Sequence, residues 1–357
     1  MTWLRPAHPG AALKIAQVAP LMESVPPRFY GGTERVVSYL TEELVRQGHE
    51  VTLFASGDSS TRAQLRPMTA RALRLDPQCG DPLACHILAL AQVAKAAGAF
   101  DIVHFHLDYL HYPLCRALHL PHVTTLHGRL DIGGLPALYR EYADMPLVSI
   151  SDHQRTPLPH ANWRATVYHG LPQQLYRYHA VHRGYLAFVG RISPEKGIEQ
   201  AIAIARGFGM PLRVAAKVDK ADRSYYEERV KPLLRGGGVE YVGEITEREK
   251  DDFLGEAYAV LCPANWPEPF GLVQIEAMAC GTPVVAFRRG AIPEVMRDGE
   301  TGFVTEDTSQ AVEALARVAA LNRRRCREIF DEHYTAARMA RDYVAVYRNL
   351  TRARGAA

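Results

Sequence analysis

The sequence has no Cys-x-x-Cys pair, no long apolar run and little net charge. Its six cysteines are scattered, and three lie in apolar stretches typical of a core, so neither a zinc site nor a disulfide framework is expected. No stretch approaches the ~20 apolar residues of a membrane span. Residues 1–13 lack the apolar segment of a secretory signal. We therefore expect a cytoplasmic chain in which residues 1–13 form a disordered extension.

Charge is nearly balanced, with 42 lysines and arginines against 39 aspartates and glutamates and a net charge of +3. This balance excludes the strongly basic surface of a dedicated nucleic-acid binder and favours a small or uncharged partner. The exception is the arginine-rich stretch 61–76, which shows little strand or helix character. It is either a solvated loop or a contact surface for an anionic acceptor or lipid headgroup, so peripheral contact with the inner membrane face stays open.

Short apolar runs alternate with segments of helical period along the 357 residues, which favours an α/β fold. This rhythm begins at 14–20 and begins again at 185–190, which predicts two doubly wound domains with parallel sheets. A polar segment without period at 169–184 would link them. The expected division is a first domain at 14–175, a second at 176–335, and a C-terminal helix and tail at 336–357.

The loop after the strand expected at 185–190 is rich in groups that bind anions. Arg191 ends this strand, and Ser193 and Pro194 are expected to start a helix whose third position is Lys196. A lysine there faces the positive end of the helix dipole, which is unfavourable unless an anion compensates. Arg191, Lys196 and the amides of the first turn therefore indicate a phosphate or pyrophosphate site, with an exposed lysine as the alternative.

Two glutamates flank the start of a second predicted helix, which runs from Gly271 to Gly281 and is apolar on nearly every side. Glu276 lies within this helix, and Glu268 lies in the proline-rich loop before it. A buried carboxylate is costly unless it accepts hydrogen bonds, which sugar hydroxyls could donate. Glu276 could bind a ribose, Glu268 a hexose, and the amides of 271–273 a phosphate; a pair of structural salt bridges is the alternative.

Signals in the first domain are weaker. Gly31 and Gly32 open its first helix and would let the backbone approach a ligand, or they are a plain loop pair. His127 follows a strand and precedes a glycine, as a residue lining a cleft would, although a lone histidine at a strand end is more often structural.

His104, His106 and Asp108 alternate along the chain, so they are expected on one face of an extended strand. They would line a cleft or bind a metal ion. We favour the lining role because no fourth ligand has a recognisable spacing.

Together these motifs resemble the retaining nucleotide-sugar glycosyltransferases of family four, which have the GT-B fold. The spacing of Glu268 and Glu276 matches the E-x7-E signature of this family, and the similarity covers nearly the whole chain from residue 14. The other matching motifs are KIAQVAP with the glycine pair, TLHG, SISD, FVGRISPEKG, YVGEI, EAMACGTPVVAF, GAIPEV and DGETGFV. The resemblance implies two Rossmann-like domains facing across a cleft, with the C-terminal helix packing back on the N-terminal domain.

The resemblance also implies roles for the matching residues. Arg191 and Lys196 would hold the donor pyrophosphate, and Glu276 would bond the ribose. Glu268 would hold sugar hydroxyls, and His127 would touch the donor hexose. Further donor contacts are expected at Gly31, Gly32, Ile245, Phe270, Gly271, Leu272 and Val273.

The implied reaction moves a hexose from a UDP- or GDP-hexose to a saccharide, lipid or small-molecule acceptor, by same-face substitution without a metal ion or cofactor. The sequence contains no Asp-x-Asp triplet and no Gly-x-Gly-x-x-Gly after a strand, and the latter disfavours a nicotinamide enzyme. The first domain would bind the acceptor, through Tyr30, His106 and Asp108. The alternatives are a nucleotide-sugar sensor without transfer activity, and an isomerase or phosphorylase on the same frame.

Overall fold

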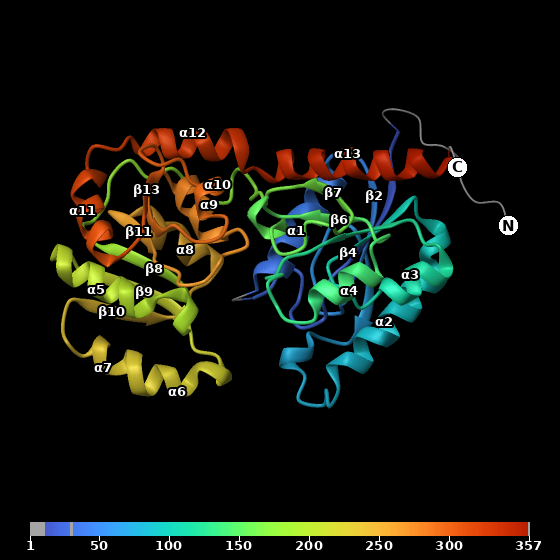
Figure 1. Cartoon of the computed structure of the whole chain (residues 1–357), viewed down its shortest axis with the longest axis horizontal. Coiled ribbons are helices and arrows are strands. Elements are labelled where there is room, and N and C mark those ends of the chain that lie inside the picture. Colours follow the sequence, from blue (N-terminus) through green and yellow to red (C-terminus); the bar gives the residue numbers. More distant parts are fainter. Residues whose placement is uncertain (1–10, 29–30, 356–357) are drawn as a thin grey trace. The chain divides into compact units, whose positions relative to one another are not determined.

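The computed structural model describes residues 11–28 and 31–355 and consists of two compact units (Figure 1). Unit 1 comprises the described residues up to Gly170 together with those from Ala336 onward, and unit 2 comprises Leu171–Thr335. The division lies a few residues before the expected boundary at 175. Tyr30, an expected acceptor contact, lies outside the described residues.

Unit 1 is built on a seven-stranded parallel sheet in the order β3-β2-β1-β4-β5-β6-β7. Its central strands are buried because they are rich in valine, isoleucine and phenylalanine. The strands are β1 (Lys14–Val18), β2 (Glu50–Ser56), β3 (Gln64–Thr69), β4 (Ile102–Phe105), β5 (His122–Thr125), β6 (Leu147–Ser149) and β7 (Trp163–Thr166). The helices are α1 (Gly32–Arg46), α2 (Pro82–Ala96), α3 (Tyr112–Leu118), α4 (Leu135–Glu141) and α13 (Ala336–Gly355).

The C-terminal helix α13 packs on α1 and belongs to unit 1, as the resemblance implied. The Tyr347 hydroxyl of α13 forms a hydrogen bond of 2.7 Å with Nδ1 of His104. It also accepts a hydrogen bond of 3.1 Å from the side-chain amide of Gln17. Tyr343, one turn earlier, lies 2.9 Å from the Thr125 hydroxyl. The helix is therefore held by a buried polar network as well as by apolar contacts.

Unit 2 repeats the architecture with a six-stranded parallel sheet in the order β10-β9-β8-β11-β12-β13. The strands are β8 (Leu186–Arg191), β9 (Leu212–Lys217), β10 (Val239–Gly243), β11 (Ala259–Cys262), β12 (Val284–Phe287) and β13 (Gly302–Thr305). The helices are α5 (Ile198–Phe208), α6 (Arg223–Tyr225), α7 (Lys231–Leu234), α8 (Glu247–Gly255), α9 (Leu272–Cys280), α10 (Ile292–Val295), α11 (Thr308–Val318) and α12 (Arg323–His333).

Short turns complete both units. Unit 1 has 3-10 turns at Leu73–Leu75, Ala97–Ala99 and His153–Arg155. Unit 2 has 3-10 turns at Pro194–Lys196 and Lys220–Asp222 and a π-helical turn at Tyr226–Val230.

The buried helix predicted between two glycines is α9, whose caps are Gly271 and Gly281. Both glycines have left-handed backbone, with φ of 95° and 79°. A Cβ at Gly281 would lie 2.8 Å from the Tyr178 ring, so only glycine closes the helix without a clash. The glycine signals therefore located both ends of this helix correctly.

Two local expectations were wrong. Pro194–Lys196 is a 3-10 turn and the helix α5 begins only at Ile198, so Lys196 is not its third residue and Ser193 makes no capping hydrogen bond. The reason is Gly197, whose left-handed φ of 76° interrupts the helical backbone. A Cβ added at this position would lie 2.0 Å from the Pro263 carbonyl oxygen, so only glycine fits there. The stretch 61–76 contains the edge strand β3, where Pro67 is tolerated because one side of the strand is unpaired.

The disordered extension expected at 1–13 is too long, because its last residue, Leu13, is fully buried. The amide of Leu13 donates to His49, and its carbonyl accepts from Glu50 at the start of β2. These bonds extend the ordered chain beyond the amino end of β1.

One segment of the described chain, Pro82–Ala99, has the length and hydropathy of a membrane-spanning helix. The expectation that no stretch approaches this composition was therefore wrong. Length and composition alone are weak evidence of a membrane span. Only 28% of this segment is buried in the structure, so α2 exposes apolar surface.

Candidate functional site

The strand order of unit 2 reverses between β8 and β11, and in such sheets ligands bind beyond the carboxyl ends of the strands at the reversal. Arg191 is the last residue of β8, and Glu268 lies in the loop between β11 and α9. A Cβ at Gly290 would lie 2.3 Å from the Glu268 amide nitrogen, so this glycine allows the loop to pack closely. The predicted site residues of unit 2 therefore gather at one edge of its sheet.

Lys196 and Glu268 form an ion pair, with Nζ 2.7 Å from Oε2. Trp266 donates its indole N–H to the same oxygen over 2.9 Å, and its ring centroid lies 4.9 Å from the lysine Nζ. Both charged side chains are largely buried. The lysine expected to attract an anion is thus paired with the glutamate expected to hold a sugar.

Arg191 lies among three carboxylates. It pairs with Glu195, lies 3.3 Å from Asp222 and lies 3.9 Å from Asp219. Lys217, at the end of β9, also pairs with Asp219 over 3.1 Å. A bound phosphate would compete with these carboxylates for the guanidinium.

Glu276 is 2% exposed, and its two carboxylate oxygens differ in environment. Oε1 accepts from Lys250 Nζ over 2.9 Å, whereas Oε2 is buried and has no hydrogen-bond partner. Lys250 lies on α8, and it is also 3.5 Å from Glu247. A buried acceptor without a donor costs about 1–3 kcal/mol, and more when it is charged. Oε2 is therefore the atom of this site that most needs a ligand hydroxyl.

The beginning of α9 offers backbone donors beside Glu276. The amides of Leu272 and Val273 lie in its first turn, where amides have no partner within the helix. Gly271 suits this turn because its φ of 95° is one that other residues rarely adopt. Oε1 of the neighbouring Gln274 is a second buried oxygen without a partner. Phe270 is buried and packs edge-on against Tyr334, 6.3 Å away, which holds the turn in place.

Cys262 at the end of β11 indicates how closely these groups are assembled. Burial, together with the negative charges of Glu268 and Glu276, raises the pKa of its thiol to about 12, and the positive charge of Lys196 acts in the opposite direction. Ile245, the expected backbone contact for a base, is half-buried in the loop between β10 and α8. This loop leads directly into the helix that carries Lys250.

The candidate residues of unit 1 lie at the carboxyl ends of β1, β4 and β5. His106 follows β4, and its Nδ1 lies 2.9 Å from Nε2 of His127 while its Nε2 lies 2.8 Å from Oε1 of Gln17. Burial lowers the pKa of His127 to about 4, so its imidazole is neutral near pH 7. Its ring stacks on His169 with centroids 5.4 Å apart. His127 can therefore act by hydrogen bonding and not by charge.

His104 and His106 lie side by side as expected, with ring centroids 4.1 Å apart, but Asp108 does not continue their face. β4 ends at Phe105, and Asp108 is exposed with a left-handed φ of 49°, so the three residues do not share an extended strand. His104 is instead bound between Tyr347 and Thr125, each at 2.7 Å. The groups with metal-ligand spacing in the described chain are elsewhere, at His111, Cys115 and His122 and at His179, Asp251 and Asp252.

Gly31 and Gly32 lie where the sequence placed them, at the start of α1. A Cβ at Gly31 would lie 2.8 Å from Pro27 Cβ, so the glycine permits close packing of the loop after β1. Glu34, two residues into the helix, is buried, and this burial raises the pKa of its carboxyl.

Lys250 is the functional candidate that the sequence did not reveal. Glu247 and Lys250 are three residues apart on one helix, a spacing typical of an exposed surface pair. Only the packing of α8 on α9 brings Lys250 to Glu276. Glu268 and Glu276 thus both form salt bridges, as the alternative interpretation of these two residues predicted. Oε2 of Glu276, however, has no partner in these salt bridges.

Two doubly wound units with candidate ligand groups at the carboxyl ends of their strands form the two-domain frame of the GT-B class. Residues 30–190 match the model of Glycosyltransferase Family 4, and residues 179–331 match the model of Glycosyl transferases group 1. The chain belongs to this family of glycosyltransferases and has the GT-B fold. The expectation of an enzyme that uses a nucleotide-sugar donor is confirmed at this level.

Curated relatives include alpha-maltose-1-phosphate synthase of Mycobacterium tuberculosis (strain ATCC 25618 / H37Rv), 28% identical over 349 residues, which are 85% of this chain and 88% of the relative. The enzyme of the same name from Mycolicibacterium smegmatis is 35% identical over 146 residues, 39% of this chain and 38% of the relative. Among solved structures, sucrose-phosphate synthase from Thermosynechococcus elongatus has a TM-score of 0.79 at 20% identity, covering 96% of this chain and 100% of that one. The Anabaena protein HepE in complex with UDP-glucose has a TM-score of 0.70 at 18% identity, with 93% and 98% covered.

Proposed function

We propose that this glycosyltransferase moves a hexose from a UDP- or GDP-hexose to a saccharide, lipid or small-molecule acceptor, with retention and without a metal ion. The observation that carries the proposal is the buried, unpartnered Oε2 of Glu276 beside the first-turn amides of α9. A carboxylate oxygen and free amides suit a ribose and a phosphate, respectively. The complex of HepE with UDP-glucose supports a UDP-hexose among the possible donors.

The proposed chemistry follows from the cations of unit 2. The bond from the hexose C1 to the diphosphate oxygen breaks, the acceptor oxygen bonds to C1 on the same face, and a phosphate oxygen takes the acceptor proton. Negative charge grows on the diphosphate, where Lys196 and Arg191 would stabilise it. When a phosphate replaces Glu268 as the partner of Lys196, the carboxylate becomes available to the hexose hydroxyls.

Unit 1 would supply the remaining contacts. We propose that the neutral His127 bonds the donor hexose, with Gly31 and Gly32 beside the diphosphate. Acceptor contacts are proposed at Tyr30, His106 and Asp108. The bond between His106 and His127 would orient the latter ring.

A donor screen tests the proposal. We expect one nucleotide series among the UDP-, GDP-, ADP- and TDP-hexoses to raise the melting temperature of the protein, equally with magnesium and with a chelator. A ligand at 100 times its dissociation constant adds about 2.7 kcal/mol of stability, which is readily detected. Slow release of the nucleoside diphosphate from the same donor should accompany binding. Stabilisation by no series, or only in the presence of magnesium, would contradict the proposal.

We further propose that unit 1 contacts the cytoplasmic face of a membrane through α2. Leu83, Ile87 and Leu88 are exposed by 56%, 52% and 68%, and they lie on one side of this helix. The neighbouring strand β3 and the turn after it carry the exposed arginines Arg66 and Arg71. Apolar side chains flanked by cations are the combination that binds anionic lipid surfaces.

Vesicle sedimentation tests this contact. Replacing both Ile87 and Leu88 by aspartate should reduce binding to phosphatidylglycerol vesicles at least tenfold, because burying one such side chain contributes about 1.5–3 kcal/mol. Val181→Asp, at an exposed apolar residue of unit 2, is the matched control and should bind like the wild type. If the wild type sediments no better with phosphatidylglycerol than with phosphatidylcholine, the arginines have no part in binding and the proposal is wrong.

A further inference from the structure

A series of hydrogen bonds runs through the interior of unit 1, from His127 to the C-terminal helix α13. It joins β1, β4 and β5 to α13 through pairs of polar atoms that lie 2.7–3.1 Å apart. This histidine network consists, in order, of His127, His106, Gln17, Tyr347, His104 and Thr125. All except the half-buried His127 are buried, so water does not compete for these bonds.

Gln17 gives the histidine network its direction, because a side-chain amide has one donor end and one acceptor end. Its Nε2 donates to the Tyr347 hydroxyl, and its Oε1 therefore accepts from Nε2 of His106. The Tyr347 hydroxyl also lies 2.7 Å from Nδ1 of His104, and a buried hydroxyl hydrogen without an acceptor is costly. The hydroxyl therefore donates to this Nδ1, and His104 donates from Nε2 to Thr125. All these bonds thus run in one direction.

The same direction fixes the position of the proton on His127. Nε2 of His106 carries the proton that Gln17 accepts, and burial lowers the pKa of this imidazole well below its ordinary value, so the ring is neutral near pH 7. Nδ1 of His106 is then an acceptor, and the proton in its 2.9 Å bond to His127 must come from Nε2 of His127. His127 is also neutral, so its Nδ1 carries a lone pair. Within the described residues this Nδ1 has no hydrogen-bond partner.

Neighbouring rings also hold the His127 ring in place. It stacks on His169 with centroids 5.4 Å apart and an interplanar angle of 16°, and its centroid lies 5.1 Å from that of His106. Both nitrogens of His106 are used in the histidine network, so its proposed contact with an acceptor would be made by ring carbons. Of these two rings, His127 is the one that can offer a nitrogen to a ligand.

We propose that the histidine network holds the proton of His127 on Nε2, so that Nδ1 accepts a hydrogen bond from a hydroxyl group of the donor hexose. Gln17, His106 and Tyr347 are then positioning residues. The inference rests on the proposed function, which assigns the hexose contact to His127. A nitrogen that can only accept selects a hydroxyl group and disfavours a carboxylate or carbonyl oxygen, neither of which donates. The donor is therefore a hexose that presents a hydroxyl group, and not an oxidised carbon, to His127.

Nitrogen NMR of the full chain, with isotopically labelled histidines, tests the tautomer without any ligand. Couplings to the ring protons distinguish Nδ1 from Nε2, and the chemical shift of each nitrogen shows whether it carries a proton. Near pH 7, His127 should have a proton on Nε2 and none on Nδ1. Its signals are identified by their loss in His127→Gln. The wild-type spectrum stands as a test even if a substitution in the histidine network impairs folding.

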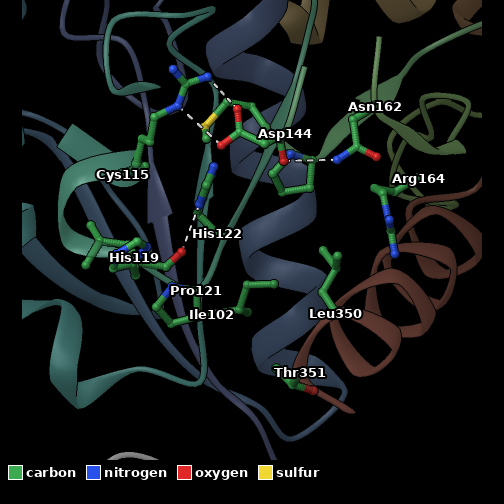
Figure 2. Close-up of a pocket in the computed structure, with 14 residues that line it drawn as sticks. Ile102, Cys115, His119, Pro121, His122, Asp144, Asn162, Arg164, Leu350 and Thr351 are labelled. Atoms are coloured by element: carbon green, nitrogen blue, oxygen red, sulfur yellow. Dashed lines mark hydrogen bonds and ion pairs between the residues drawn. The ribbon is translucent and has the colours of Figure 1, made fainter. Parts of the chain in front are cut away.

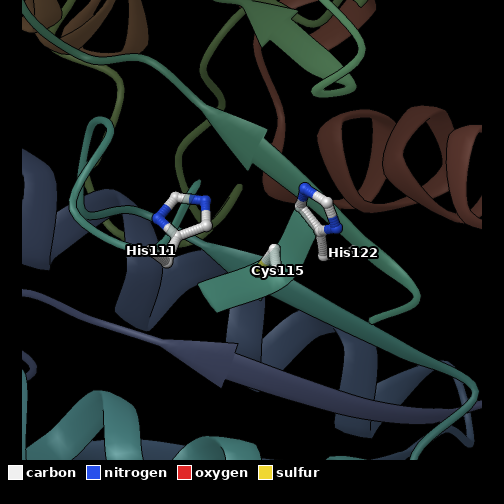
Figure 3. A group of neighbouring side chains, drawn as sticks. All are labelled: His111, Cys115 and His122. Atoms are coloured by element: carbon white, nitrogen blue, oxygen red, sulfur yellow. The ribbon is translucent and has the colours of Figure 1, made fainter. Parts of the chain in front are cut away.

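Two histidines of unit 1 outside the histidine network provide references for a ring protonated at Nδ1. His86 accepts from a backbone amide at Nε2, and its Nδ1 lies 2.7 Å from a backbone carbonyl oxygen, which can only accept. Nδ1 of His122 lies 2.9 Å from another backbone carbonyl oxygen. Figure 3 shows this histidine, which is grouped with His111 and Cys115. The pattern of His86 found at His127 would overturn the proposal.

Tyr347→Phe tests the role of α13 in the histidine network. Without the hydroxyl, Nε2 of Gln17 has no acceptor and the amide can turn over, which would reverse the proton positions on His106 and His127. The signals of His127 should therefore show a mixture of two tautomers, and Gln17→Leu should have the same effect.

Thr351→Val is the matched control for Tyr347→Phe. Thr351 lies one turn further along α13, where its hydroxyl donates to a backbone carbonyl of the same helix. It lines a cavity of about 360 Å³ and is no member of the histidine network (Figure 2). The variant should keep the single tautomer of His127. An unmixed tautomer in a folded Tyr347→Phe protein would show that α13 does not set the proton position.

The donor found in the nucleotide screen tests the hexose contact. Its deoxyfluoro analogues replace one hydroxyl group at a time by fluorine, which cannot donate a hydrogen bond. Calorimetry should reveal one analogue that binds the wild type about 5- to 10-fold more weakly than the parent donor, but binds His127→Phe as well as the parent does. If no donor binds, the proposed function fails. If a donor binds but no analogue behaves in this way, or if Nδ1 of His127 carries the proton, this inference alone is overturned.

Discussion

Replacing Lys196 by alanine is expected to lower the rate of glycosyl transfer by about 100- to 1000-fold, the usual effect of losing one preorganised donor to a developing anion. The Lys196 side chain is largely buried beside Glu268 and Trp266, where water screens its charge poorly. In the proposed reaction this charge acts on the departing diphosphate. The loss should therefore appear mainly in kcat, measured with saturating donor.

The same substitution also leaves Glu268 without its cation, so folding must be measured in parallel. Trp266 still donates to the glutamate, which limits the damage. Lys231→Ala is the matched control, because that lysine forms an exposed pair with Glu227 and such pairs contribute about 0–1 kcal/mol. A rate loss below tenfold in a folded Lys196→Ala protein would exclude the proposed role.

Glu276→Gln is expected to weaken donor binding by about 10- to 100-fold, because a hydrogen bond to a charged group contributes about 1.5–3 kcal/mol. The structural reason is Oε2, which is buried and lacks a donor. Calorimetry with the ribonucleotide and its 2′- and 3′-deoxy forms measures the effect. Only the wild type should distinguish these ligands, since the variant has already lost the bond that the missing hydroxyl would make.

Lys250 complicates this experiment, because it is buried and pairs with Glu276. Removing one member of a buried pair costs about 3–5 kcal/mol, so Glu276→Gln could lose affinity through misfolding. The double variant Glu276→Gln with Lys250→Met removes both charges of the buried pair and should recover part of the stability without recovering ribose preference; Glu247 loses a cation 3.5 Å away in the same variant. Glu240→Gln, at an exposed partner of Arg213, is the control. Recovery of ribose preference in the double variant would show that Glu276 does not bind the ribose.

Local signals predicted much of this fold. The glycines at 271 and 281 bounded α9 because their left-handed backbone is a property of a few adjacent residues. The return of apolar strands in the second half predicted two sheets for the same reason. The prediction failed at Pro194–Lys196, where Gly197 packs against Pro263 more than sixty residues away and prevents the expected helix. It also failed at β3, which is ordered by pairing with β2.

The sequence by itself determined the identity of the family and the two α/β units. It also determined the position of Arg191 at a strand end and of Lys196, Glu268 and Glu276 in the segments that follow strands. These features depend on short-range periodicity and spacing. The tertiary structure decided which charges meet: Lys196 with Glu268, and Glu276 with Lys250 from another helix. It also brought His122 to His111 and Cys115. Such contacts depend on how helices pack on a sheet, and this packing is set by the whole core and not by any one segment.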